Sequence, residues 1–210
     1  SMGLSYLSNS GIVDIAQPLL NRLAEVSGEL VRLSVVDGER LTWVARAQGA
    51  RQGLRYDPDM GSDARLSCSS SGWALLSTLS DDEALALVAK QGLGLPEQFG
   101  PAAPTSLQAV MAAVAQTRER GYSMTTDTYS IGLSAMSAPV RFAGQAAFGV
   151  VTVAGPTVRF TPEKMQTLAP ELISITQQLA ASSGASPFFS LTAETGSAAS
   201  TDGRKPIYAV

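Results

Sequence analysis

Residues 31–46 read VRLSVVDGERLTWVAR, and this stretch decides the class of fold. Apolar and polar side chains alternate before the Asp37-Gly38 pair and again after it, which is the two-residue period of a β-strand. Asp-Gly is a preferred sequence for the tight turn of a hairpin. The stretch therefore predicts two antiparallel strands, with Arg32 and Ser34 on the face opposite the apolar residues of the first strand.

Helical patterns surround this hairpin. Apolar residues recur at three- and four-residue spacing from 12 to 26 and again from 165 to 179, which predicts two amphipathic helices. Helical signals also occupy 72–91, interrupted by a capping box that begins at Ser80, and 105–121. The hairpin is thus preceded by one predicted helix and followed by several.

Three further extended segments, at 122–126, 133–142 and 147–154, follow one another with short connections. Strands joined so closely pair antiparallel, because a parallel pair needs a crossover of a dozen residues or more. We therefore expect an α+β fold, an antiparallel β-sheet with helices packed on it. A polar stretch from 48 to 65 is expected to form a long loop over one face.

The composition excludes several classes of function. The 210 residues contain no histidine, so Ser-His-Asp and Cys-His catalytic pairs and most zinc sites are excluded. A net charge of -3, with no cluster of arginines and aromatics, argues against nucleic-acid binding by this chain itself. A single cysteine and the lack of a long apolar run predict a cytoplasmic protein that does not cross a membrane. No cofactor is expected.

A second stretch, residues 65–73, reads RLSCSSSGW and carries the only cysteine. Cys68 could be a nucleophile near a helix start, but the histidine that usually activates a thiol is missing, which favours a residue of the pocket wall. The serine hydroxyls could donate to a carboxylate or phosphate, although helix capping needs only one of them. Asp127 likewise has two interpretations, since an Asp shortly before Gly132 is a common turn former.

Three segments in order resemble the effector-binding domain of the IclR family of transcriptional regulators. They are Met60 to Leu76 with its serines before Gly72, Arg118 to Tyr122 leading to Asp127, and Ser137 to Val140 followed by Gly149 to Pro156. The resemblance implies a GAF-like fold, a homodimer or homotetramer, and a pocket for a small-molecule effector, often a carboxylic or aromatic acid. Such regulators bind DNA through an N-terminal winged helix-turn-helix, which we expect to be absent from this chain.

The resemblance also implies the ligand-binding residues, position by position. They are Ser69, Ser70, Ser71, Trp73, Asp127, Ala135, Thr152 and Ala154. This sequence departs from the family where Ser67 replaces the usual His, Trp73 the usual Lys, and Ala135 a frequent Cys. Because Ala154 also lacks a hydroxyl, one wall should be less polar. This favours an aromatic or partly apolar ligand over a two-carbon acid.

Two alternatives remain beside the regulator. One is a stand-alone GAF-type sensor with another output, and the other is a hydrolase that uses Cys68 or Asp127. The missing base makes the hydrolase the weaker of the two, so we expect no enzymatic activity and no metal site. The chain divides into a cloning scar or linker at 1–4, the effector-binding domain at 5–183, and a flexible tail rich in small polar residues at 184–210.

Overall fold

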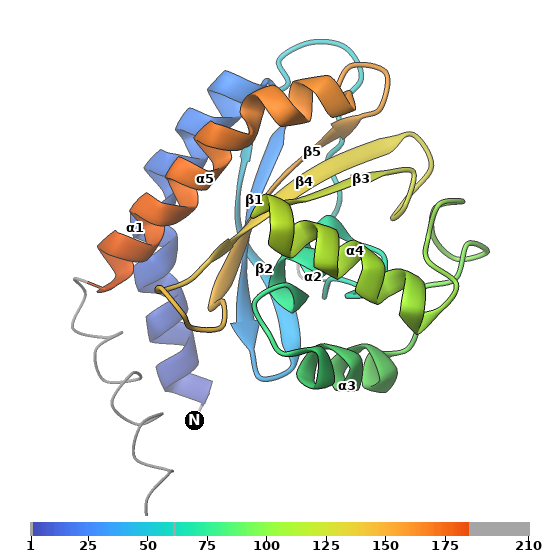
Figure 1. Ribbon diagram of the computed structural model, residues 1–210. Coiled ribbons are helices and arrows are strands. Elements are labelled where there is room, and N and C mark those ends of the chain that lie inside the picture. Colours follow the sequence, from blue (N-terminus) through green and yellow to red (C-terminus); the bar gives the residue numbers. More distant parts are fainter. Residues whose placement is uncertain (1, 61, 185–210) are drawn as a thin grey trace, which may run out of the picture.

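The computed structural model describes residues 2–60 and 62–184, and of their side chains those from residue 11 onward. One five-stranded sheet of order β2-β1-β5-β4-β3 carries helices on both faces (Figure 1). All strand pairs are antiparallel, so the predicted α+β class is confirmed. The tail expected at 184–210 lies outside the described residues apart from Gly184, and residues 2–4 of the expected scar belong to the first helix.

The elements alternate along the chain much as the periodicity indicates. The strands are β1 (Leu30–Asp37), β2 (Arg40–Gln48), β3 (Ser123–Thr126), β4 (Leu133–Val140) and β5 (Gly149–Pro156); the helices are α1 (Met2–Ser27), α2 (Ser70–Leu76), α3 (Asp81–Gln91), α4 (Leu107–Arg120) and α5 (Pro162–Gly184). The predicted hairpin is confirmed: Asp37 pairs with Arg40, and Gly38 takes a φ of 62° in the turn. None of the described helices is both long enough and apolar enough to cross a membrane.

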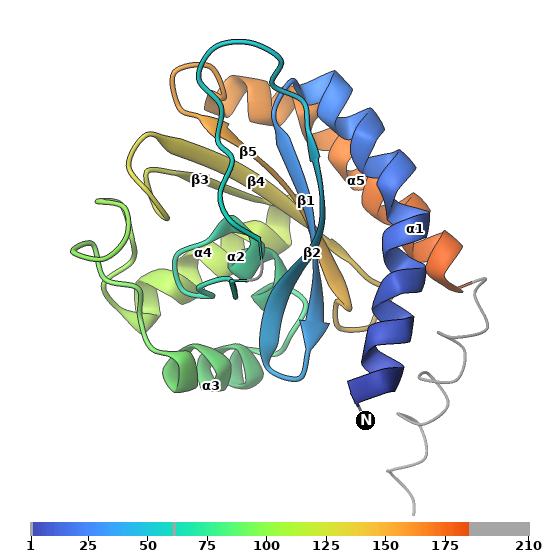
Figure 2. The same cartoon turned by 180° about the vertical axis from the view of Figure 1, so that it is seen from behind.

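Helices α1 and α5 lie side by side across one face of the sheet (Figures 1 and 2). Their apolar stripes and the inward side chains of β1 and β5 form the larger core, which includes Ile12, Leu20, Leu23, Leu172, Ile175, Val31, Leu33, Val151 and Val153. Helix α1 begins at Met2, upstream of the expected start near residue 12. The apolar period marks the buried stripe of a helix, and it does not fix the residue at which the helix begins.

Helices α2, α3 and α4 lie on the opposite face. The predicted capping box of α3 is present, since Ser80 Oγ accepts from the Glu83 N–H and the Glu83 carboxylate accepts from the Ser80 N–H. Helix α2 is pressed against the chain before it, because a Cβ on Gly72 would lie 2.4 Å from the Leu66 carbonyl oxygen. Glycine at this position is therefore what allows α2 to lie so close to the loop that carries Leu66.

A row of polar residues crosses the sheet on the face that α2 covers. Arg32 on β1, Thr152 on β5, Ser137 on β4 and Ser123 on β3 stand in register. Residues directly opposite each other on paired strands share a face, so these four side chains line up beneath α2. All four are buried. Buried polar side chains need partners, and this row marks where the candidate site lies.

Candidate functional site

The serines at the start of α2 are buried and most are hydrogen-bonded within the loop that carries them. Ser69 caps the helix, because its Oγ accepts from the Gly72 N–H at 3.0 Å. Its hydroxyl also lies 3.2 Å from Ser71 Oγ. Ser67 Oγ accepts from the Gly94 N–H at 2.8 Å. The capping interpretation therefore accounts for Ser69, and Ser67 fixes the neighbouring loop.

Ser70 links α2 to the polar row. Its Oγ lies 2.7 Å from Ser137 Oγ, which lies 2.7 Å from Thr152 Oγ1. Ser123 Oγ donates to the Ser70 carbonyl oxygen at 2.6 Å. These bonds tie the helix start to β3, β4 and β5, and a continuous chain of hydroxyls runs from Ser70 through Ser137 to Thr152. Such a chain fixes the distance between the start of the helix and the sheet.

A cavity of about 50 Å³ lies beside this chain of hydroxyls, between α2 and the sheet. Six of the eight residues predicted from the sequence line it, namely Ser69, Ser70, Ser71, Ala135, Thr152 and Ala154. They come from α2, β4 and β5, three segments far apart in the chain. The fold thus brings most of the predicted residues to one place.

Trp73 and Asp127 do not line this cavity. Trp73 is buried within α2, and its indole N–H donates to the Ser67 carbonyl oxygen at 3.0 Å. Asp127 has a left-handed φ of 55°, and its Oδ1 accepts from the Gly132 N–H at 2.6 Å. This geometry matches the turn-forming interpretation of Asp127.

The most unusual lining residue is one that the sequence-based prediction of the site omitted. Arg32 is only 7% exposed, and its guanidinium carbon lies 3.7 Å from the centroid of the Trp43 ring. Its Nε has no hydrogen-bond partner. Burial lowers the pKa of Arg32, although an arginine remains charged at neutral pH. The strand alternation does signal this residue, since it places Arg32 on the face away from the larger core.

Another part of the wall is apolar. Leu133, Ala135 and Ala154 form a small cluster of their own, against which Tyr56 and Tyr129 pack. The Tyr56 ring centroid lies 5.7 Å from the Arg32 guanidinium carbon, and burial raises the pKa of its hydroxyl. The cavity therefore has a cationic, hydroxyl-bearing side and an apolar side. The expectation of one less polar wall agrees with this arrangement.

The segment between β2 and α2 covers the cavity from outside, and Figure 2 shows it running back across the sheet towards α2. Tyr56 and Ala64 of this segment line the cavity. Gln48 Nε2 donates to the Tyr56 carbonyl oxygen at 3.0 Å, and the Ala64 N–H donates to the Leu41 carbonyl oxygen at 3.0 Å. The side chains of residues 51–59 are exposed apart from those of Tyr56 and Pro58, so few buried apolar contacts hold this part of the segment.

Comparison with known proteins places this architecture in a family. Residues 4–181 match the family model described as "Bacterial transcriptional regulator IclR C-terminal". The chain belongs to the IclR family. Two curated relatives of this IclR-type domain are the HTH-type transcriptional regulator BhcR of Paracoccus denitrificans, 28% identical over 178 residues, and the HTH-type transcriptional repressor AllR of Escherichia coli, 24% identical over 164 residues. The matched regions cover 84% and 78% of this chain.

The IclR-type domain spans about three fifths of the length of these relatives, 62% of BhcR and 59% of AllR. Two solved structures share its fold. The Thermotoga maritima IclR structure has a TM-score of 0.74 at 20% identity, and covers 87% of this chain and 73% of its own. The second is the inducer-binding domain of PobR from Acinetobacter, a double mutant in complex with 3-hydroxybenzoic acid. It has a TM-score of 0.70 at 23% identity, and the match covers 80% of this chain and 97% of the PobR chain.

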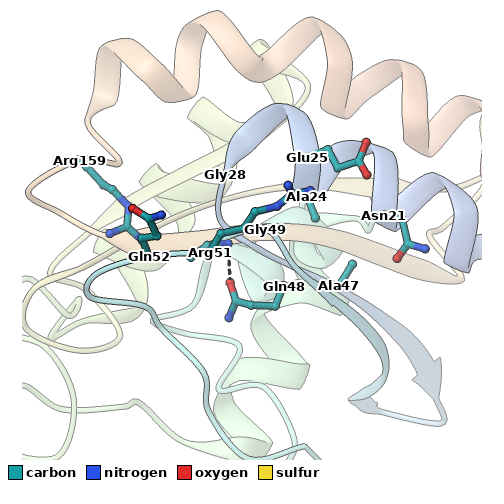
Figure 3. Close-up of a pocket in the computed structure, with 11 residues that line it drawn as sticks. Asn21, Ala24, Glu25, Gly28, Ala47, Gln48, Gly49, Arg51, Gln52 and Arg159 are labelled. Atoms are coloured by element: carbon teal, nitrogen blue, oxygen red, sulfur yellow. Dashed lines mark hydrogen bonds between the residues drawn. The ribbon is translucent and has the colours of Figure 1, made fainter.

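A larger hollow of this IclR-type domain lies elsewhere. It is an open groove of about 810 Å³ between the end of α1 and the chain that follows β2 (Figure 3). Arg51, Gln52 and Arg159 border it, and so do Gln48 and Ala50, whose N–H donates to Gln48 Oε1 at 3.1 Å. None of the predicted ligand-binding residues lines it. Its size reflects its openness to solvent, whereas the smaller cavity has the converging polar groups of a binding site.

Cys68 is buried beside the site in an environment that disfavours the thiolate. Its side chain is fully buried, and burial raises the pKa of the thiol to about 11. A thiol with such a pKa is almost entirely protonated at neutral pH and is a poor nucleophile. Within residues 2–60 and 62–184, no group of three or more Cys, Asp or Glu side chains could hold a metal ion.

Proposed function

We propose that this domain binds a small-molecule effector in the cavity between α2 and the sheet. In the longer proteins of this family, that binding would regulate transcription. The observation that carries the proposal is the convergence of Ser69 to Ser71, Ala135, Thr152 and Ala154 on one cavity. A site with apolar walls and a few converging polar groups is typical of small-molecule binding.

Coupling to DNA would operate through a change of population. A ligand that binds one arrangement of the domain better than another shifts the equilibrium by no more than its differential affinity. In a homodimer or homotetramer, that shift would change the spacing of paired DNA-binding helices on an N-terminal winged helix-turn-helix outside this chain. A protein with this role acts in the cytoplasm.

A hydrolase is disfavoured by the state of its two candidate residues. The buried Cys68 thiol has a pKa of about 11, and the Asp127 carboxylate is engaged with the Gly132 N–H. General-base catalysis needs a group that is free to take a proton near neutral pH. The named relatives are transcriptional regulators, which also favours a sensor without catalytic activity.

Thermal shift and calorimetry with a panel of small acids test the proposal. The panel pairs short 2-oxo acids with benzoate and 3-hydroxybenzoate, the last because a structural neighbour is in complex with it. Ala154→Leu fills the cavity from the apolar wall, and we expect it to abolish any ligand-induced rise in Tm while the domain stays folded.

The matched control is Ala169→Leu on α5, since Ala169 packs in the core on the other face of the sheet. Overpacking there costs stability in the same way without touching the cavity. Loss of binding in Ala154→Leu alone supports the cavity as the site. Binding that survives Ala154→Leu, or a panel in which no acid raises the Tm of the parent domain, would refute the assignment.

A further inference from the structure

Arg32 is a buried cation for which the described part of the chain supplies no anion. The residue is 93% buried, and none of the ion pairs among the described residues includes it. Arg32 lines the cavity, its Nε makes no hydrogen bond, and the side-chain hydrogen bond that its guanidinium does make is to the neutral Tyr56. Moving an unpaired charge from water into a protein is unfavourable, so buried charges normally have a counter-ion. Arg32 is an exception to this rule, and it lies in the wall of a cavity.

Two carboxylates on segments next to Arg32 or Tyr56 in sequence are engaged with other cations. Asp57 of the covering segment pairs with Arg46 at 2.9 Å. Glu29, just before β1, pairs with Arg159 at 2.7 Å. Arg46, the register partner of Arg32 on β2, adds a second charge of the same sign. The surroundings of Arg32 are therefore short of one negative charge.

We propose that Arg32 is the anion anchor of the cavity and takes the carboxylate of the effector. This inference rests on the proposed function and deepens it by assigning the recognition of charge to one residue on β1. Arg32 donates to the carboxylate through its unpaired Nε–H, and a charge-assisted bond of this kind is stronger than a bond between neutral groups. The ligand thus completes the ion pair that the domain lacks.

The neighbours of Arg32 prepare it for this role. The Trp43 ring lies against one face of the guanidinium, which fixes the plane of its donors before a ligand arrives. Thr152, the register partner of Arg32 on β5, places a hydroxyl beside the same spot. A side chain already held in position loses little conformational entropy on binding.

The remaining walls define the rest of the ligand. Leu133, Ala135 and Ala154 line the cavity beside these polar groups, so the body attached to the carboxylate is apolar. The present volume of about 50 Å³ is far below the roughly 300–1,000 Å³ of sites that enclose drug-sized ligands. A ring-sized body therefore requires Tyr56 and its covering segment to move outward. The ligand class is a small monocarboxylate with a compact apolar body.

Matched acids and amides test the anchor without relying on a variant. Benzoate and benzamide, and 3-hydroxybenzoate and 3-hydroxybenzamide, differ in charge and hardly in shape. We expect the acids to bind the 210-residue chain and the amides to bind at least about 10-fold more weakly, since a hydrogen bond between charged groups is the stronger one. Calorimetry and the ligand-induced rise in Tm both measure this.

Arg32→Met should lower the affinity for the acids about 10- to 100-fold and leave the affinity for the amides unchanged. Arg32→Lys keeps the charge but not the planar donors, so it should retain part of the affinity. The control is Arg22→Met, which removes an exposed arginine from the far face of the sheet, where Arg22 pairs with Glu171. Without ligand, Arg32→Met should keep or raise the Tm, because removing an unpaired buried charge relieves a penalty.

The outcomes separate this inference from the proposed function. Acids that bind Arg32→Met as well as the parent domain, yet fail to bind Ala154→Leu, would overturn the anchor and leave the cavity as the site. Equal binding of acids and amides would do the same. A lower Tm of ligand-free Arg32→Met, with acid binding retained in Arg32→Lys and Arg32→Met, would assign Arg32 a structural role. Failure of every acid and every amide to bind would count against both proposals.

Discussion

Removing Arg159 should destabilise the domain more than neutralising its partner Glu29. The Arg159 guanidinium forms two bonds with the Glu29 carboxylate, at 2.7 and 3.0 Å, and it also donates to the Leu54 carbonyl oxygen of the covering segment. Glu29 is only 1% exposed, whereas the side chain of Arg159 is 33% exposed. Water can therefore solvate Arg159 when it is left alone, but it cannot reach Glu29.

Arg159→Met leaves the buried carboxylate with only Lys164, whose Nζ lies 3.7 Å away. Breaking a buried pair in this way costs about 3–5 kcal/mol, and Lys164 should keep the loss near 3 kcal/mol. Glu29→Gln removes the charge and keeps an acceptor, so it should cost about 1 kcal/mol. For a domain of this size, these losses lower Tm by about 6–12 °C and 2–4 °C.

Urea unfolding followed by circular dichroism measures both losses, and the double variant Arg159→Met with Glu29→Met provides the control. Replacing both charges with apolar groups should recover part of the stability lost in Arg159→Met alone, because no unpaired charge is left. If Glu29→Gln were as costly as Arg159→Met, or if Arg159→Met were neutral, the argument from unequal burial would be wrong.

Two further predictions concern the residues for which a catalytic role was considered. Asp127→Ala should lower the free energy of unfolding by about 1–3 kcal/mol, because it removes the bond to Gly132 and puts alanine at a positive φ. Asp127→Asn keeps an acceptor for the Gly132 N–H and tolerates the positive φ. Ligand affinity should change in neither variant. Unfolding and calorimetry test this, and a selective loss of affinity would contradict it. Cys68 should resist thiol reagents at pH 8 in the folded domain. The folded pKa of the thiol, about 11, lies above its unfolded value. The stability that the buried thiol contributes is therefore present below about pH 8.5 and falls as the pH rises towards 11. Fast labelling of Cys68 at pH 8 would refute the expected resistance to thiol reagents.

The local patterns in the sequence were sufficient for most of the fold. The alternation around Asp37-Gly38 and the short links from β3 to β5 determine an antiparallel sheet, and both features depend only on neighbours in sequence. The capping box at Ser80 is equally local. The start of α1 at Met2 was missed because the prediction began the helix where the apolar spacing of residues 12–26 begins. Apolar spacing locates the buried stripe of a helix and does not fix its first residue.

The candidate site was predictable only in part. Ser70 and Ala135 could be assigned by resemblance to family motifs, and both line the cavity. Asp127 could be assigned in the same way, yet its left-handed backbone directs the carboxylate to Gly132 instead. Arg32 belongs to no such motif. Its lack of an anion depends on which carboxylates the fold pairs with other cations, and that is a property of tertiary structure.

A crystal structure of the domain with the tightest-binding acid of the panel tests the central claim most directly. We predict that the ligand lies between α2 and the sheet, with a carboxylate oxygen about 2.7–2.9 Å from Arg32 Nε and its apolar body against Ala135 and Ala154. The segment that carries Tyr56 should be displaced outward to admit it. A ligand bound in the groove beside Arg51, or one in the cavity with its carboxylate turned away from Arg32, would contradict the account.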